Sequence, residues 1–208
     1  MKIAVFGGTG QTGKAFVTQA LQAGHKVRVL ARTPEKMDLV HDHLQVLKGD
    51  VTHQADVQQA LEGQDIAVCT IGGNGLSDAS TRTIGTGHII TAMKSMQIKK
   101  LVVCSVLGIG GSKKHLGMMG HMVLKTILKK PRQDHEAQEE LVYNSGLEWV
   151  IIRPPQLING PSSGTYKVVA ENERNFVGTK MTRADVAHCM MRACQEDGWV
   201  KQAWSISY

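Results

Sequence analysis

Three observations predict a doubly wound α/β fold built on a parallel sheet. Short apolar runs alternate along the chain with segments of helical spacing, and the connections between them are short. A glycine-rich turn follows the first apolar run, Lys2–Phe6. Strands that alternate with helices in this way form parallel sheets covered on both faces, through right-handed crossovers. We expect about seven strands in one domain over residues 1–208, with a substrate pocket formed by its C-terminal half.

The first half of the chain is the more regular. The expected strands are Lys2–Phe6, Lys26–Ala31, Leu44–Leu47, Asp65–Ile71 and Lys100–Val106. The expected helices are Gln11–Ala23, Asp56–Leu61 and Thr83–Met96. Gly24 is expected to end the first of these helices, because a residue free to adopt positive φ is favoured after a helix.

The second half is less regular, and its elements depend on breakers and caps. We expect helices over Leu116–Lys129, Asp134–Ser145 and Arg183–Cys194, and strands over Leu147–Arg153 and Trp204–Tyr208. Gly146 closes the second of these helices, and Pro154 and Pro155 stop the strand before them. Thr182 is the expected N-cap of the last helix, with Asp185 at the third helical position in a capping-box-like pattern.

Composition limits the class of protein. Hydrophobic residues make up 42% and aromatic residues 4%, so we expect a core of aliphatic side chains and methionine. No apolar stretch is long enough to span a membrane, and a strand at the start predicts no secretory leader. The cysteines lack a CxxC spacing, which argues against a metal site and favours reduced thiols in a cytoplasmic protein; they are Cys69, Cys104, Cys189 and Cys194.

The positive charge is unevenly distributed. The formal net charge is +6, and the stretch between Asp78 and Asp134 has no acidic residue but ten lysines and arginines. One interpretation is an ordinary solvated face. The other is a positive field that attracts an anionic ligand, in which case we expect Lys113 and Lys114 near the mouth of the substrate pocket.

The glycine-rich turn is the strongest motif. It reads Gly7-Gly8-Thr9-Gly10-Gln11-Thr12-Gly13 and joins the first strand to the first helix. In the Rossmann dinucleotide-binding fold, glycines here allow the tight turn, the approach of the pyrophosphate and close helix–strand packing. The helix N-terminus offers its N–H groups to phosphate. This context makes dinucleotide binding the leading prediction.

The second strand ends in Arg32 rather than in an acidic residue, and this favours NADP over NAD. An NAD-binding protein usually places Asp or Glu there to accept from the ribose 2′-hydroxyl. Arg32 can clamp a 2′-phosphate and stack on adenine, and Lys36 adds charge. The alternative is that Arg32 only caps the edge of the sheet.

Later strand ends extend the predicted site. Asp50 follows the third strand, where a carboxylate can accept from the adenine amino group, and Val51 can cover the ring. Gly72 and Gly73 follow the fourth strand, where the dinucleotide should pass close to the backbone. Open α/β sheets bind ligands at these carboxyl ends.

The chain resembles the atypical short-chain dehydrogenases, an NmrA-like branch. The resemblance runs nearly end to end, through FGGTGQTG, VLAR, GDV, KLVVCS, DHEAQEELVYNSGLEWVIIRPP and TRADVAH. Within that branch it is most similar to the NADPH-dependent flavin reductases, also called biliverdin-IXβ reductases. The resemblance implies a Rossmann fold, NADP as cofactor, and hydride transfer to a flavin or a bilin.

Two positions depart from the pattern of classical short-chain dehydrogenases, and two others depart from that of the flavin reductases. The tyrosine and lysine of classical members fall on Pro131 and His135. The flavin reductases' serine falls on Val106, with Ser105 one place earlier, and their histidine falls on Gln156. The resemblance therefore implies chemistry without the usual acid–base tyrosine.

The catalytic candidates are Ser105, His135 and Gln156. Ser105 either faces the nicotinamide or satisfies a local backbone group, and His135, beside Asp134, either touches the ribose or faces solvent. Cys104 is a contact to the cofactor or a core thiol. Pro154 and Pro155, which follow Arg153, have no N–H to donate. We therefore expect the backbone carbonyls near them to be free to bind the carboxamide of the nicotinamide. Three methionines form an adaptable lid over a flat ring or belong to the core: Met118, Met119 and Met122.

The sequence therefore predicts an NADPH-dependent reductase of flavins such as FMN and riboflavin, with biliverdin and similar flat rings as further acceptors. The alternatives are a non-catalytic NADP(H) sensor and a quinone reductase. We expect an anionic or flat aromatic small-molecule partner, no nucleic-acid or membrane partner, and a monomer or weak homodimer.

Overall fold

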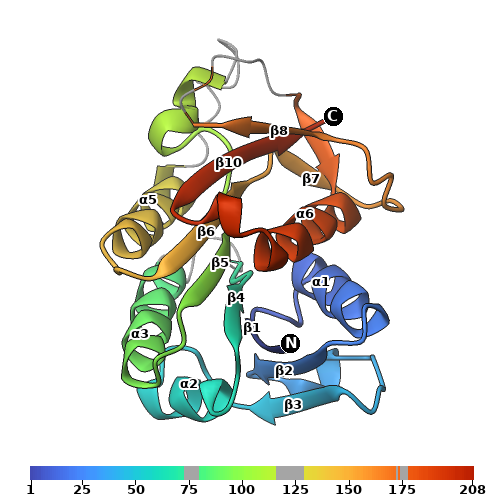
Figure 1. Ribbon diagram of the computed structural model, residues 1–208, viewed down its shortest axis with the longest axis vertical. Helices are drawn as coiled ribbons and strands as arrows, with labels where there is room; N and C mark the ends of the chain where they lie inside the picture. Colours follow the sequence, from blue (N-terminus) through green and yellow to red (C-terminus); the bar gives the residue numbers. More distant parts are fainter. Residues whose placement is uncertain (73–79, 116–128, 172, 174–177) are drawn as a thin grey trace.

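An eight-stranded sheet runs through the computed structural model, which describes residues 1–72, 80–115, 129–171, 173 and 178–208 (Figure 1). The strand order is β3-β2-β1-β4-β5-β6-β10-β8. The strands are β1 (Lys2–Phe6), β2 (Lys26–Ala31), β3 (Leu44–Lys48), β4 (Ile66–Cys69), β5 (Lys100–Cys104), β6 (Glu148–Arg153), β8 (Lys167–Ala170) and β10 (Gln202–Ser207).

The sheet is parallel except at one edge, where β8 pairs antiparallel with β10. The order of strands reverses between β1 and β4, and in an open α/β sheet that point opens a crevice at the carboxyl ends of the strands. The predicted doubly wound Rossmann-like class is therefore confirmed.

Helices cover both faces of the sheet (Figure 1). On one face lie α1 (Gln11–Gln22) and α6 (Arg183–Gln195), which pack against each other. On the other lie α2 (Gln54–Leu61), α3 (Thr81–Ser95) and α5 (Lys129–Tyr143). Three short 3-10 turns are described besides: η1 (Pro34–Lys36), η3 (Gly110–His115) and η4 (Asp197–Trp199).

The core has two layers, one under each helical face. Along β1, Ile3 and Val5 join the layer under α1 and α6, whereas Ala4 and Phe6 join the layer under α2 and α3. Because both sides of the central strands are buried, their sequences are continuously apolar instead of alternating. The layers consist mainly of aliphatic residues and methionine, as the composition predicts.

Several boundaries differ from those expected. The fourth and fifth strands end earlier, at Cys69 and Cys104. α5 is described from Lys129, ahead of the start expected at Asp134. The helix expected over Leu116–Lys129 lies outside the described residues, apart from Lys129 itself.

Three strands were not predicted. β8 forms the antiparallel edge, and β7 (Gln156–Ile158) pairs with β9 (Lys180–Thr182) in a separate two-stranded sheet. The predicted parallel sheet of about seven strands is present, and the prediction missed only these additional strands, because such short segments carry no alternation long enough to be recognised.

Two predicted helix ends are confirmed. Gly24 follows the C-cap of α1 with φ +78°. The Thr182 hydroxyl accepts a hydrogen bond from the Asp185 N–H at 3.1 Å, so Thr182 caps α6.

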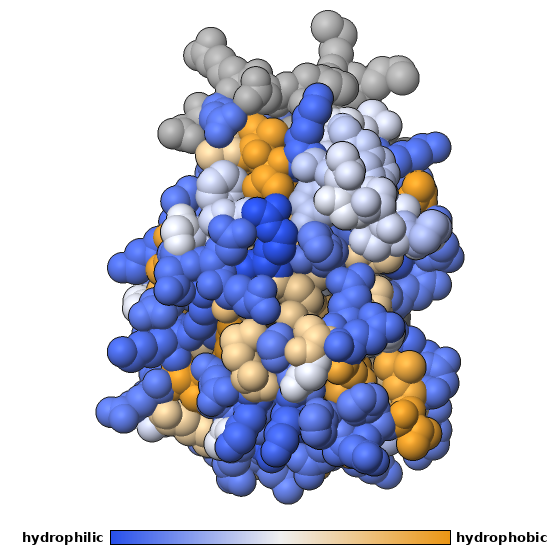
Figure 2. Space-filling model, turned by 45° about the vertical axis from the view of Figure 1, so that its right-hand side comes forward, coloured by the Kyte–Doolittle hydropathy of each residue, from blue (hydrophilic) through white to orange (hydrophobic). Residues whose placement is uncertain are grey.

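The surface carries no single large apolar face in the view of Figure 2, where hydrophobic residues lie in separate small patches among hydrophilic ones. Individual large apolar side chains are exposed, among them Val40, Ile84 and Leu141. Across the described ranges, no helix is both long and apolar enough to cross a membrane.

Candidate functional site

A cavity of about 250 Å³ opens at the carboxyl ends of β1, β2, β3 and β4. This is where the reversal of strand order predicts a ligand crevice. Its lining residues are Gly7, Thr9, Gly10, Leu30, Ala31, Arg32, Thr33, Lys36, Gly49, Asp50, Val51, Ile71, Gly72 and Thr81. Eight of the sequence-predicted cofactor residues are thus brought together on its walls: Gly7, Thr9, Gly10, Arg32, Lys36, Asp50, Val51 and Gly72.

The glycines of the turn differ in what they do. Gly7 has φ +87°, which a residue with a side chain rarely adopts. A Cβ on Gly13 would lie 2.3 Å from the Gly7 carbonyl oxygen, so Gly13 allows α1 to pack against the end of β1. A Cβ on Gly10 would meet only the Gly7 oxygen, at 3.3 Å. Packing therefore requires glycine at Gly7 and Gly13, whereas a Cβ at Gly10 needs the Gly7 carbonyl to shift by only a few tenths of an ångström.

The start of α1 is uncapped by any side chain. Gly10 is the N-cap and makes no side-chain hydrogen bond, and the first turn contains no acidic residue. Gln11 and Thr12 begin the helix beside the cavity. A helix start of this kind presents unpaired N–H groups and partial positive charge, which together suit a phosphate.

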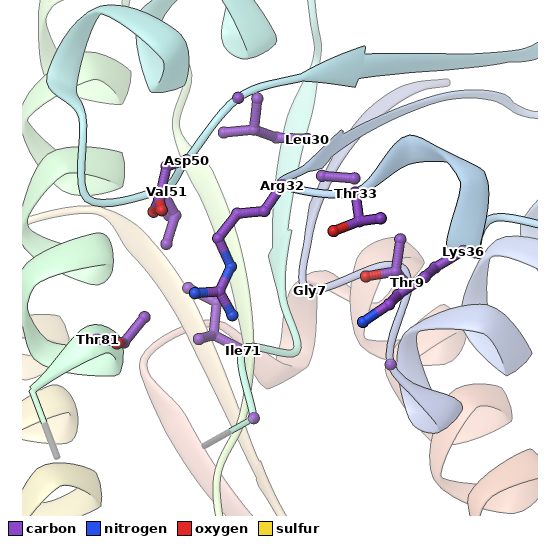
Figure 3. A pocket seen from close by; sticks show the side chains of 14 residues that line it. Gly7, Thr9, Leu30, Arg32, Thr33, Lys36, Asp50, Val51, Ile71 and Thr81 are labelled. Atoms are coloured by element: carbon purple, nitrogen blue, oxygen red, sulfur yellow. The ribbon is translucent and has the colours of Figure 1, made fainter. Parts of the chain in front are cut away.

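Arg32 extends into the middle of the cavity (Figure 3). Asp50 and Val51 lie on one side of it, and Thr9 and Lys36 lie on the other. Arg32 and Lys36 are both exposed and both line the cavity, and the charge of Arg32 also acts on Asp50. Arg32 directly follows β2, as expected, and its side chain lies in the cavity.

Asp50 is held as a carboxylate. Partial burial opposes ionisation, but the Thr52 N–H and hydroxyl both donate to Oδ1 at 2.9 Å. Together with the charge of Arg32, these bonds lower the pKa of Asp50 below its ordinary value. The group therefore acts as a hydrogen-bond acceptor at neutral pH.

The end of β4 brings backbone to the cavity. Gly72 is exposed, and nothing lies within 4 Å of the position that a Cβ would take there. The Gly72 N–H donates to none of the described residues. Gly73, the other glycine predicted here, lies outside the described residues.

Ser105 follows β5 and is 6% exposed. Its N–H donates to the Ile152 carbonyl at 2.8 Å, whereas its hydroxyl has no partner among the described residues. A buried hydroxyl without a partner is costly, and no hydrogen bond among the described residues supports the alternative in which the Ser105 hydroxyl satisfies a local backbone group. Cys104, one place earlier, is partly buried, and burial raises the pKa of its thiol to about 12.

His135 lies in the first half of α5, and its Nδ1 is buried without a partner among the described residues. Burial, assisted by the positive charge of Arg82, lowers the pKa of His135 to about 3. The imidazole is therefore neutral at physiological pH, although the residue as a whole is only partly buried and keeps part of its surface open to solvent. The side chain of Pro131, at the tyrosine position, is not described.

The strand end after Arg153 corrects one expectation. Pro154 and Pro155 are buried, and the Pro154 carbonyl accepts a hydrogen bond from the Leu107 N–H at 2.8 Å. This carbonyl, expected to be free for a carboxamide, already has one donor. Gln156 begins β7 and is exposed, with its N–H bonded to the Thr179 carbonyl at 3.2 Å.

Two buried ion pairs near these strand ends were missed. Arg82 on α3 pairs with Asp134 on α5 at 2.9 Å. Arg153 is fully buried and donates to both carboxylate oxygens of Glu139, at 2.9 and 2.7 Å. Each pair joins residues far apart in the sequence, so local patterns gave no signal for them.

In the folded protein, acidic side chains from later elements lie beside the stretch between Asp78 and Asp134. Lys113 pairs with Glu136 at 3.3 Å, Lys100 with Asp197 at 3.3 Å, and Arg82 with Asp134. Acidic side chains from later elements thus neutralise part of the predicted positive field. The four cysteines are free thiols, and the described part of the chain holds no group of His, Cys, Asp or Glu arranged to bind a metal.

Relatives of known sequence match most of the chain. An uncharacterised chloroplast protein of Arabidopsis thaliana is 28% identical over 210 residues, which cover 94% of this chain and 72% of the relative. The reductase pytE of Aspergillus terreus is 25% identical over 256 residues, covering 99% of this chain and 97% of that protein.

Solved structures share the fold. A short-chain dehydrogenase/reductase of Veillonella parvula in complex with NADP superposes with a TM-score of 0.84 at 16% identity, covering 100% of this chain and 94% of that one. ChuY, an anaerobilin reductase of Escherichia coli O157:H7, gives 0.81 at 19% identity, covering 100% and 97%. A family model described as NAD(P)H-binding matches residues 7–197. The chain therefore belongs to the NAD(P)H-binding family.

Proposed function

We propose that this protein is an NADPH-dependent reductase that delivers hydride to a flat, electron-accepting ring, with free flavin as the favoured acceptor. The observation that carries the proposal is the cavity, in which an uncapped helix start, Arg32 and Lys36 converge around open space. Membership of the NAD(P)H-binding family and the likeness to a named reductase support the same class.

The residues present fit an NADP dinucleotide. The start of α1 at Gly10–Gly13 would hold the pyrophosphate, because its N–H groups are uncapped and Gly10 leaves room above them. Arg32 and Lys36 would bind the 2′-phosphate. Asp50 would accept from the adenine amino group, and Val51 would cover the ring.

Ser105, His135, Pro154 and Pro155 would line the nicotinamide end, beyond the carboxyl ends of β5 and β6. The bound dinucleotide supplies a hydride, and the side chains place the ring against its acceptor and exclude water. The hydroxyl of Ser105 and the Nδ1 of His135 are buried without described partners, so each has hydrogen-bonding capacity left for a ligand.

The acid–base character of this end favours a flavin over an ordinary ketone. Cys104 is a poor proton donor because its pKa is raised to about 12, and His135 is neutral because its pKa is lowered to about 3. Gln156 has no acidic proton. A reduced flavin can take its proton from water, so hydride transfer needs little else from the protein.

The test is the rate of NADPH consumption with FMN, riboflavin or biliverdin as acceptor. We expect turnover with at least one flavin, and a lower kcat/KM with NADH. Gly10→Val is the matched control: it should remove dinucleotide binding, so any turnover it retains belongs to a contaminant. Wild-type protein that binds NADPH and reduces none of these acceptors would contradict the proposal.

Two other functions remain in the comparison. A non-catalytic NADP(H) sensor is favoured because none of the described side chains proposed at the nicotinamide end is suited to donate a proton, and it predicts tight NADPH binding without turnover. A quinone reductase would transfer the same hydride as a flavin reductase, and it likewise needs no acidic side chain of the protein. Replacing FMN by a soluble quinone in the same assay distinguishes the two enzymes.

A further inference from the structure

Arg82 connects the wall of the cavity to the start of α5. It lies in the first turn of α3, next to the cavity-lining Thr81, and is 9% exposed. Its Nε donates to the Ile71 carbonyl at 3.0 Å, and its NH1 donates to the Asp134 carboxylate at 2.9 Å. One guanidinium therefore holds both the end of β4 and the end of α5 that carries His135.

Asp134 completes this connection. It is 3% exposed, and its other carboxylate oxygen accepts from the Thr83 N–H at 3.2 Å and from the Thr83 hydroxyl at 2.7 Å. All these donors come from the first turn of α3. The start of α3, the start of α5 and the backbone after β4 are thus fixed to one another through two side chains.

The bond to Ile71 has a consequence for Gly72. In a trans peptide the carbonyl and the following N–H point in opposite directions. Because Arg82 holds the Ile71 carbonyl, the Gly72 N–H is turned away from Arg82. That N–H donates to none of the described residues, Gly72 is exposed, and the residue lines the cavity.

Stability alone is a weak explanation for a pair of this kind. Burying two charges costs desolvation that their attraction often only balances, and well-packed apolar residues can do as well. What the pair provides is geometry, since the fork of an arginine can bind two acceptors in fixed directions. A lysine at the same place would keep the charge but could not reproduce both bonds.

We propose that Arg82 and Asp134 are positioning residues, which set the peptide between Ile71 and Gly72 for a hydrogen bond from the Gly72 N–H to the bound dinucleotide and hold His135 beside the nicotinamide end. This inference rests on the proposed function, because it places the dinucleotide in the cavity. It adds two residues that touch no part of the cofactor themselves.

The experiment measures NADPH binding by calorimetry in wild type, Arg82→Lys, Arg82→Ala and Asp134→Asn. We expect Arg82→Ala to weaken binding about tenfold, and Arg82→Lys to weaken it too although the charge is kept. Arg28→Ala is the control: Arg28 also binds a carbonyl, that of Glu62 at 2.7 Å, but does not line the cavity, so its loss should leave the Kd unchanged.

A second readout, the amide resonance of Gly72 in the NADPH-free protein, separates positioning from general damage. We expect it to move in Arg82→Lys, with most other amide resonances unchanged. Wild type that fails to bind NADPH would contradict the proposed function. A folded Arg82→Lys with an unchanged Gly72 resonance and unchanged NADPH affinity would overturn the positioning role. If Arg82→Ala does not fold, the NADPH affinities of Arg82→Lys and Asp134→Asn test the positioning role in its place.

Discussion

The two ends of the candidate site are built in different ways. The proposed adenosine end, at β1 to β4, is an open cavity whose walls are backbone turns and exposed charged side chains such as Arg32. The proposed nicotinamide end, around β5, β6 and α5, contains buried polar groups, among them Ser105 and the ion pair of Arg153 with Glu139. The first end is specified by short local motifs, the second by contacts between distant segments. Substitutions should therefore act on binding at the first end and on geometry or protonation at the second.

The largest expected effect separates two glycines of the same turn. Gly10→Val should weaken NADPH binding by about 100-fold or more with little loss of stability, because its side chain would occupy open space where the pyrophosphate is expected. Gly13→Ala should lower the free energy of unfolding by about 3 kcal/mol, because its Cβ would meet the Gly7 oxygen at 2.3 Å. Calorimetric binding and urea unfolding measure the two. Normal NADPH binding by Gly10→Val would show that the phosphate site is misplaced.

The next effect concerns the choice of cofactor. NADPH should bind at least tenfold tighter than NADH, about 1.4 kcal/mol, and Arg32→Ala should erase most of this preference. Lys36→Ala should have a smaller effect, because an ammonium binds phosphate through a single point charge. Equal affinity of the wild type for NADH and NADPH would return Arg32 to the role of an edge residue.

A third effect belongs to the nicotinamide end and depends on pH. The pKa of His135 is lowered from 6.5 to about 3, so the folded protein resists a proton that the unfolded chain accepts. Stability should therefore fall as the pH drops below about 6.5 and keep its full value above it. Relative to wild type, His135→Gln should reduce this acid sensitivity in urea unfolding near pH 4.5 and pH 7.5. If the free energy of unfolding depends on pH in the same way in both proteins, groups other than His135 cause the loss of stability in acid.

The smallest effect concerns the lysines of η3. The double change Lys113→Glu with Lys114→Glu is expected to reduce FMN turnover while sparing uncharged lumiflavin, and added salt should shrink the difference between the two acceptors. Because Lys113 already pairs with Glu136, and because exposed charges are screened within about 8 Å, we expect roughly a twofold change. If FMN and lumiflavin respond alike, these lysines only belong to a solvated face.

Eight residues named from the sequence lie together on the walls of the cavity, and they could be named because each of their signals is local. A turn such as Gly7–Gly13 needs its glycines whatever surrounds it, and the missing acid at the tip of β2 is visible in the residues themselves. The class of the fold follows from the same local alternation of strands and helices. The capping of α6 by Thr182 is likewise contained in four consecutive residues.

The nicotinamide end resists such prediction for a physical reason. Arg82 and Asp134 stand 52 residues apart, and their pairing exists only once α3 and α5 pack together. The acid-free stretch is a second example, because the acids that pair with its Arg82, Lys100 and Lys113 come from later elements. β8 was missed because an edge strand of four residues carries little pattern.

The most direct test of the central claim is a comparison of FMN reduction by NADPH and by NADPH deuterated at the transferred C4 position. The account predicts FMN-dependent loss of NADPH that is slower with the deuterated cofactor and is absent in Gly10→Val. Wild-type protein that binds NADPH tightly but consumes none of it with FMN, riboflavin or a quinone would contradict the account and favour the sensor.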